Sequence, residues 1–147
     1  MFGNFTLASG LTFTGTSNNT FMGRSAQTIT RAGATVTAPI AIDADGGSYT
    51  LQDSWVSTKR ITLTSGTFDT NDQTCTSSDC VALGSATWTG GSSTWTLTGT
   101  GTVWAWTTGT VTAETSTIKI TDTSTSAITF DGASKTYNNI YWSRGAS

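Results

Sequence analysis

The side chains that could do acid–base or nucleophilic chemistry are few in this chain of 147 residues. The sequence contains nine Asp and Glu residues and two Cys residues, and it has no histidine. Without histidine, Ser-His-Asp and Cys-His catalysis are excluded and the usual transition-metal sites are disfavoured. The chemistry left open is that of paired carboxylates, of cations bound by oxygen ligands, and of the two thiols.

Paired carboxylates can hydrolyse glycosides when the two acids lie at a suitable separation. Asp122 and Asp131 are such a pair, because they flank a predicted strand. Both stand in turn contexts, where aspartate commonly caps its own backbone. We therefore expect no enzymatic activity, and a glycan-degrading enzyme is kept as an alternative function.

Clustered oxygen ligands of the kind that calcium prefers occur in two short segments. One segment contains Asp43 and Asp45, and the other contains Asp69 and Asp72. Neither matches the full twelve-residue calcium loop, so we favour solvated turns at both places and expect no cofactor.

The two cysteines, Cys75 and Cys80, enclose four residues. This spacing allows a small disulfide in an oxidising compartment, and two unpaired thiols are the alternative. The sequence leaves both states open. Two cysteines without histidine make a zinc site improbable.

Several aromatic side chains are candidates for binding a glycan or a partner protein. Trp104 and Trp106 alternate with smaller residues, so both indoles lie on one side of a predicted strand. If exposed, they would form a platform for sugar rings or a docking patch. Burial of both is the alternative, and it is favoured because large residues face inward in the neighbouring strand. Tyr141 and Trp142, in a final predicted strand, are further candidates for this role.

A ten-residue pattern recurs along the chain. S-T-W-T-L-T-G-T-G-T starts at Ser93, and S-T-I-K-I-T-D-T-S-T starts 23 positions later at Ser116. In each copy apolar residues alternate with polar ones before a run of turn-forming residues, which predicts a half-buried strand entering a bend.

Weaker copies upstream extend the repeat. Its central apolar residues are spaced by 23, 27, 34 and 23 positions and are Phe13, Val36, Leu63, Leu97 and Ile120. Periods of this size predict an all-β fold, a β-solenoid of roughly five irregular coils in which these five side chains stack as one core column. A β-sandwich is the alternative fold.

The composition agrees with this fold. Threonine supplies 35 residues, glycine 16 and proline one, and no window has helical periodicity. Fifteen aromatic residues, six Trp, six Phe and three Tyr, argue against disorder. We expect residues 1–147 to form a single β-rich repeat domain, or one module of a larger assembly.

Charge and hydropathy limit the partners. Charged residues make up 11% of the chain, the net charge is −2 and the basic residues are scattered. This pattern disfavours nucleic acid as a partner. No apolar run approaches the roughly 20 residues of a membrane span, so we expect no membrane insertion.

Threonine pairs flank the central apolar residues and would project outward as a ladder. The pairs are Thr12/Thr14, Thr35/Thr37, Thr62/Thr64 and Thr96/Thr98. This ladder resembles those of β-solenoid ice-binding proteins, which makes ice binding a second alternative function. Two features argue against it: Lys119 replaces Thr96 in the last copy, and the coil spacing is uneven.

The second half of the chain resembles the repetitive β-rich modules of large bacteriophage virion and tail-fibre proteins and of bacterial surface adhesins. The segments that carry the resemblance are 66–74, 91–104, 115–122 and 130–139. It implies a structural or adhesive module of a virion, tail fibre or extracellular filament, located on a virion or a cell surface. Its expected partners are copies of itself, other virion or filament subunits, and surface glycans.

Overall fold

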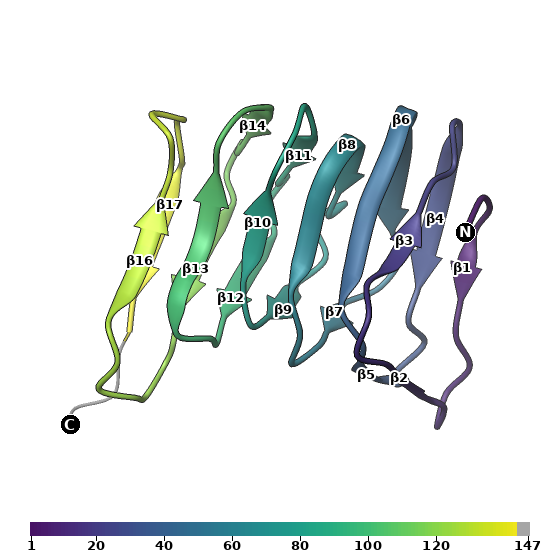
Figure 1. Ribbon diagram of the computed structural model, residues 1–147, viewed down its shortest axis with the longest axis horizontal. Helices are drawn as coiled ribbons and strands as arrows, with labels where there is room; N and C mark the ends of the chain where they lie inside the picture. Colours follow the sequence, from purple (N-terminus) through teal and green to yellow (C-terminus); the bar gives the residue numbers. More distant parts are fainter. Residues whose placement is uncertain (144–147) are drawn as a thin grey trace.

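The computed structural model describes residues 1–143, and this part of the chain is all-β, with seventeen strands and no helix. Parallel strands stack in a β-solenoid of about six coils, with the first and last described strands at opposite ends of the stack (Figure 1). The predicted fold class is therefore confirmed. The expected number of coils is one too small, because the chain from Val36 to Leu97 forms three coils, through Ser57 and Ser77, where the sequence pattern counts two.

The strands of the coils form three faces, and all strand pairing between coils is parallel. The first face consists of β3 (Asn19–Phe21), the first part of β6 (Ile40–Leu51), the first part of β8 (Ile61–Asp69), β10 (Cys80–Ala82), β13 (Gly101–Trp106) and β16 (Ile128–Asp131). The second face consists of β1 (Phe5–Thr6), β4 (Ala26–Thr30), the remainders of β6 and β8, β11 (Thr87–Thr89) and β14 (Thr110–Thr112).

The third face carries most of the predicted threonine ladder, and we call its outer surface the threonine face. It consists of β2 (Thr12–Thr14), β5 (Thr35–Thr37), β7 (Trp55–Val56), β9 (Cys75–Ser77), β12 (Thr94–Leu97), β15 (Thr117–Ile120) and β17 (Asn139–Trp142). A bridge between Val36 and Ser57 joins the β2–β5 pair to the other five strands.

The corners between faces need glycine where coils approach closely. Gly66, in the bend of β8, has φ +76°, and a Cβ there would meet the Ala44 carbonyl oxygen of the preceding coil. Gly109 has φ +67° and lies against the Ala86 carbonyl oxygen in the same way. Only glycine combines a left-handed backbone with this contact, so these residues let the chain turn while the coils stay in register.

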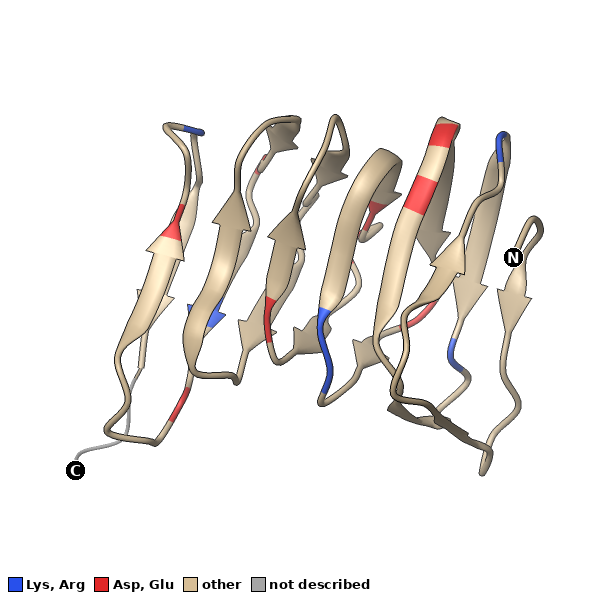
Figure 2. Ribbon diagram, in the orientation of Figure 1, with Lys and Arg blue, Asp and Glu red and all other residues tan. Residues whose placement is uncertain are grey.

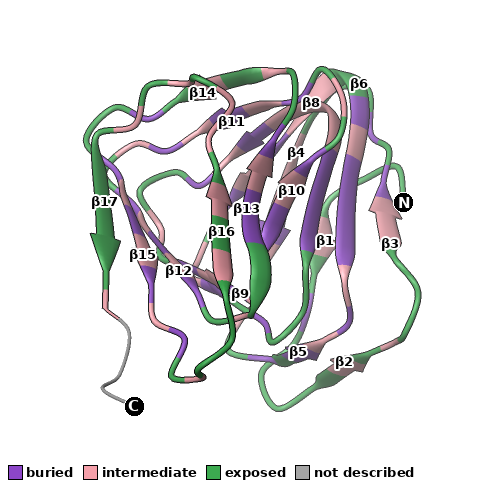
Figure 3. Cartoon of the chain, turned by 60° about the vertical axis from the view of Figure 1, so that its left-hand side comes forward, coloured by how far each residue is buried: buried purple, intermediate pink, exposed green. Residues whose placement is uncertain are grey.

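Along most strands buried residues alternate with more exposed ones (Figure 3), and the buried apolar side chains form one core cluster. Aromatic rings fill much of it. At the amino-terminal end Phe5, Phe21 and Tyr49 make edge-to-face contacts, with centroids 5.1 and 5.2 Å apart. Further along, four tryptophans touch one another: Trp88, Trp95, Trp104 and Trp106. Burial of these large rings supplies the main stabilisation of a chain with so few aliphatic residues.

Of the five residues predicted to stack in one core column, one lies elsewhere. Phe13 pairs with Val36, and Leu97 pairs with Ile120, all on the third face. Leu63 is buried but lies on the first face, where it pairs with Ile42 and Ala82.

Two buried serines, Ser57 and Ser77, complete the column on the third face. Val36 pairs with Ser57, and Ser77 pairs with Leu97. Both hydroxyls have partners, because Ser57 accepts a hydrogen bond from the Lys59 backbone N–H (3.0 Å) and Ser77 from the Trp95 indole N–H (2.9 Å). These bonds offset the cost of burying a hydroxyl.

The core column predicts a sharp contrast between two neighbouring substitutions. Leu97→Asp would place a carboxylate in a fully buried position, and we expect the free energy of unfolding to fall by about 4 kcal/mol or more. Thr98→Ser keeps the hydroxyl that donates to the Ser77 carbonyl oxygen, so its effect should be within about 0.5 kcal/mol. Urea unfolding of both variants measures the difference, and equal stabilities would contradict this core assignment.

Candidate functional site

The threonine face presents hydroxyl groups in rows that run across the coils. The central row runs through paired positions of seven strands and contains Thr12, Thr35, Val56, Thr76, Thr96, Lys119 and Tyr141. A second row, two residues further along each strand, contains Thr14, Thr37, Thr58, Ser78, Thr98 and Thr121. Neighbouring positions are separated by about 4.8 Å between coils and about 7 Å along a strand.

This ladder is more regular than the sequence suggests. Successive members of the central row are separated by 23, 21, 20, 20, 23 and 22 residues. The spacing expected from sequence is uneven because it counts Thr62 and Thr64 in the same ladder. They belong to β8 on the first face, where Thr62 is buried. The coil lengths vary mainly in the corners, so the face itself stays in register.

The central row has two interruptions among the threonines. Val56 is 44% exposed and places an isopropyl group in the row. Lys119 occupies the position between Thr96 and Tyr141. Its ammonium group lies 5.6 Å from the centroid of the Tyr141 ring, within the range of a cation–π contact.

Charges are sparse over the faces of the coil (Figure 2). An ion pair of Arg60 with Asp79 at 2.7 Å links neighbouring coils where the chain enters the first face. The hydrogen bond from Arg60 to Asp79 raises the pKa of the guanidinium, although burial opposes this effect. Arg60 is half exposed, so the pair adds little stability.

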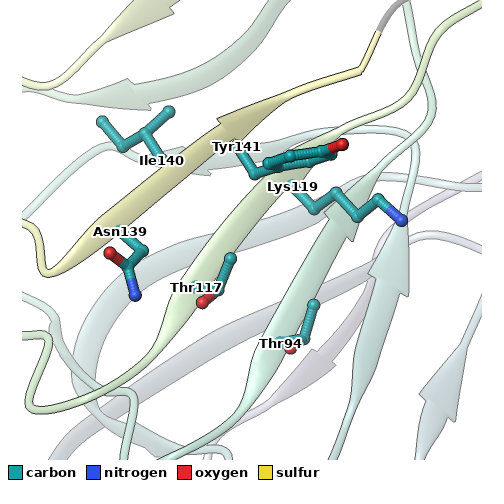
Figure 4. A pocket seen from close by; sticks show the side chains of 6 residues that line it. All are labelled: Thr94, Thr117, Lys119, Asn139, Ile140 and Tyr141. Atoms are coloured by element: carbon teal, nitrogen blue, oxygen red, sulfur yellow. The ribbon is translucent and has the colours of Figure 1, made fainter.

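Two depressions lie on the threonine face, one toward each end. The larger has a volume of about 480 Å³ and is lined by Thr94, Thr117, Lys119, Asn139, Ile140 and Tyr141 (Figure 4). The smaller has a volume of about 170 Å³ and is lined by Arg31, Ala34, Thr35, Val36, Thr37, Val56, Ser57 and Thr58. The guanidinium of Arg31 is held by hydrogen bonds to the carbonyl oxygens of Ala34 and Ser54.

The aromatic candidates fall into two groups. Tyr141 and Trp142 are 55% and 47% exposed and are available to a partner. Trp104 and Trp106 are fully buried, so the exposed platform considered for them is wrong and the favoured alternative of burial is confirmed. A register shift in β13 near Thr102 turns Val103 inward as well, and both indoles join the core.

The buried Trp104 is held on several sides. Its ring stacks on Phe130 with centroids 5.9 Å apart, and its indole N–H donates to the Tyr137 hydroxyl at 2.9 Å. Burial raises the pKa of Tyr137, while the hydrogen bond from Trp104 opposes that shift.

Two of the aspartates considered as calcium ligands, Asp43 and Asp45, lie in the bend of β6. Asp43 accepts a hydrogen bond from the Ser65 hydroxyl of the next coil at 2.8 Å, and Asp45 is exposed to solvent. This contact stabilises the corner between two coils.

The other two, Asp69 and Asp72, bracket a turn. Asp69 accepts a hydrogen bond from the Asn71 backbone N–H at 2.8 Å. Asp72 accepts one from the Ser92 backbone N–H in the next coil, which lowers the pKa of its carboxyl group. Within residues 1–143 no group of three metal-ligating side chains comes together.

The carboxylate pair considered for glycoside hydrolysis also caps turns. Asp122 accepts hydrogen bonds from the backbone N–H and the hydroxyl of Ser124, at 3.1 and 2.7 Å. Asp131 accepts a hydrogen bond from the Ala133 backbone N–H at 3.2 Å. Each carboxylate stabilises its own bend, as the turn contexts predict.

The two cysteines are unpaired thiols, so the disulfide alternative is wrong for this structure. Cys75 points into the core from the third face, between Trp55 and Trp95. Cys80 points into it from the first face, between Ile61 and Trp104. Burial raises the pKa of both thiols well above the usual value.

These buried thiols should be inert until the chain unfolds, because the thiolate is the reactive form. We expect Cys75 and Cys80 to react with Ellman's reagent at pH 8 only after addition of guanidinium chloride. The reagent should then release two equivalents of its coloured thionitrobenzoate ion per chain. Rapid reaction of the native protein would contradict their burial. Absence of reaction in denaturant would indicate a disulfide.

The larger depression is not evident from the sequence, which presents Lys119 as a defect in the threonine ladder and Tyr141 as a separate aromatic candidate. The two lie 22 residues apart, close to the repeat period, and this offset is the signal that could have paired them. Asn139 pairs with Thr117, and Thr117 pairs with Thr94, which brings three polar side chains beside them.

The described residues contain no helix of the length and hydropathy needed to cross a membrane. No protein-family model, curated protein or solved structure matches this chain. The threonine face with its two depressions is therefore the candidate site on physical grounds alone.

Proposed function

We propose that this chain is a non-catalytic structural and adhesive module of a virion, tail fibre or extracellular filament, and that its threonine face binds surface glycans or neighbouring subunits. The observation that carries the proposal is the register of the outward threonines, which arranges their hydroxyl groups in regular rows across the coils. Both depressions lie on this same surface.

The chemistry of the face suits glycans and protein edges. A threonine hydroxyl both donates and accepts hydrogen bonds, so rows of them can match the hydroxyl groups of a polysaccharide. β-branched side chains are restricted at χ1 and lose little freedom on binding. The rigid backing comes from parallel ladders between coils, which also resist shear and proteolysis.

The last described coil supports the proposal that a partner stacks on this end of the solenoid. Ile140 and Trp142 pair with Ile118 and Ile120 of the preceding coil. Ile118 and Ile120 are buried, whereas Ile140 and Trp142 are each 47% exposed. β16 and β17 each pair with a single strand among the described residues. Unpaired parallel edges with apolar side chains favour docking of a neighbouring module or subunit.

A substitution at the centre of the threonine face tests the adhesive role. Thr76→Glu would place a flexible anionic side chain in the central row, and we expect it to reduce binding to a glycan array about tenfold or more. Thr87→Glu is the matched control, because Thr87 has the same partial exposure in a middle coil of the second face. Circular dichroism would confirm that both variants fold. Equal binding by the two variants, or no glycan or subunit binding by the parent chain, would contradict the proposal.

Ice binding is a second candidate, favoured by the regular two-dimensional spacing of the same hydroxyl and methyl groups. If it is correct, the protein slows ice growth, and Thr76→Glu abolishes the effect while Thr87→Glu does not. Normal ice growth in the presence of the parent chain would exclude this candidate and leave the adhesive one in place.

A further inference from the structure

The larger depression combines a cation, an aromatic ring and polar side chains at one end of the threonine face. The ring of Tyr141 lies beside the Lys119 side chain, and Thr117 and Thr94 continue the row on the neighbouring strands (Figure 4). The Asn139 amide borders the same space. The residues that line it include one ammonium group and no carboxylate.

Each of these groups matches a feature of a sugar. An aromatic ring packs against the apolar face of a pyranose, and Tyr141 is exposed enough to do so. The Asn139 amide and the hydroxyl groups of Thr94 and Thr117 can exchange hydrogen bonds with sugar hydroxyls. The ammonium of Lys119 favours an anion, since a charge-assisted hydrogen bond is about twice as strong as a neutral one.

The charge pattern selects among anionic glycans. Lys119 is the single cation among the described residues that line the depression, and the chain has a net charge of −2. A densely sulfated polymer would meet one cation and a negatively charged protein, whereas a sparsely charged glycan needs only one ammonium group at a time. A carboxylate flanked by neutral sugars is the chemistry that fits.

We propose that this depression binds a uronic acid residue of a sparsely charged glycan, with Lys119 contacting the carboxylate and Tyr141 packing on the adjoining neutral sugar. This inference rests on the proposed glycan-binding function and names its ligand class. The contact between the ammonium and the Tyr141 ring holds both groups at the depression before the sugar arrives, which lowers the cost of ordering them on binding.

Isothermal titration with two defined oligosaccharides tests the inference. The probes are a hyaluronan hexasaccharide, in which glucuronate alternates with N-acetylglucosamine, and chitohexaose, which is neutral. We expect the parent chain to bind the hyaluronan hexasaccharide about tenfold more tightly. Lys119→Gln should abolish this preference and Lys119→Arg should retain it, while Tyr141→Ala should weaken binding of both probes.

The matched control is Lys59→Gln, which removes one positive charge from an exposed lysine in another coil. It should leave the preference for hyaluronan unchanged. Equal affinities for the two probes, equal effects of Lys119→Gln and Lys59→Gln, or tighter binding of a heparin hexasaccharide would overturn the inference. If the glycan array shows binding that Lys119→Gln does not alter, this inference fails while the proposed function stands. An array with no bound glycan overturns this inference, and it removes the proposed function as well if the parent chain also binds no neighbouring subunit.

Discussion

Register between inward side chains of successive coils is the constraint on which this structure depends. A single coil cannot bury its apolar residues alone, so each must find a counterpart at the same position in the next coil. Trp95 over Ile118 and Leu97 over Ile120 show this pairing on the third face. The outward threonines inherit the same register, because side chains alternate along a strand. The regular rows of the threonine face are thus a consequence of core packing.

The core accommodates side chains of very different size within one column. Serines occupy two levels of the column that elsewhere holds leucine and isoleucine, and the large indole of Trp95 reaches across to the hydroxyl of Ser77. Not every buried polar group is satisfied so well. Among the described residues, the indole N–H groups of Trp55, Trp88 and Trp106 have no hydrogen-bond partner. Each costs about 1–3 kcal/mol, which the burial of the surrounding aromatic rings must offset.

The architecture could be predicted from the sequence, because threonine alternating with apolar residues is typical of strands and the repeat at Ser93 and Ser116 places two such strands one coil apart. The face to which each segment belongs could not. Leu63 carries the same threonine flanks as Leu97 but lies on another face. The inward positions of Ser57 and Ser77 could not be predicted either, because a serine does not signal burial. The depression at Lys119 is not evident from the sequence because its residues come from three strands, and only the pairing of those strands brings them together.

The tryptophan cluster also bears on how the chain reaches this structure. Parallel coils are held by contacts between segments about 20 residues apart, so the first pair of coils must close loops before any favourable contact forms. The coils that contain Trp88, Trp95 and Trp104 gain the most stabilisation from loop closure, because their rings contact one another. We therefore expect these coils to be the folding nucleus. Folding would then propagate outward one level at a time, and the terminal strands β2 and β17, exposed along most of their length, would be the first to fray.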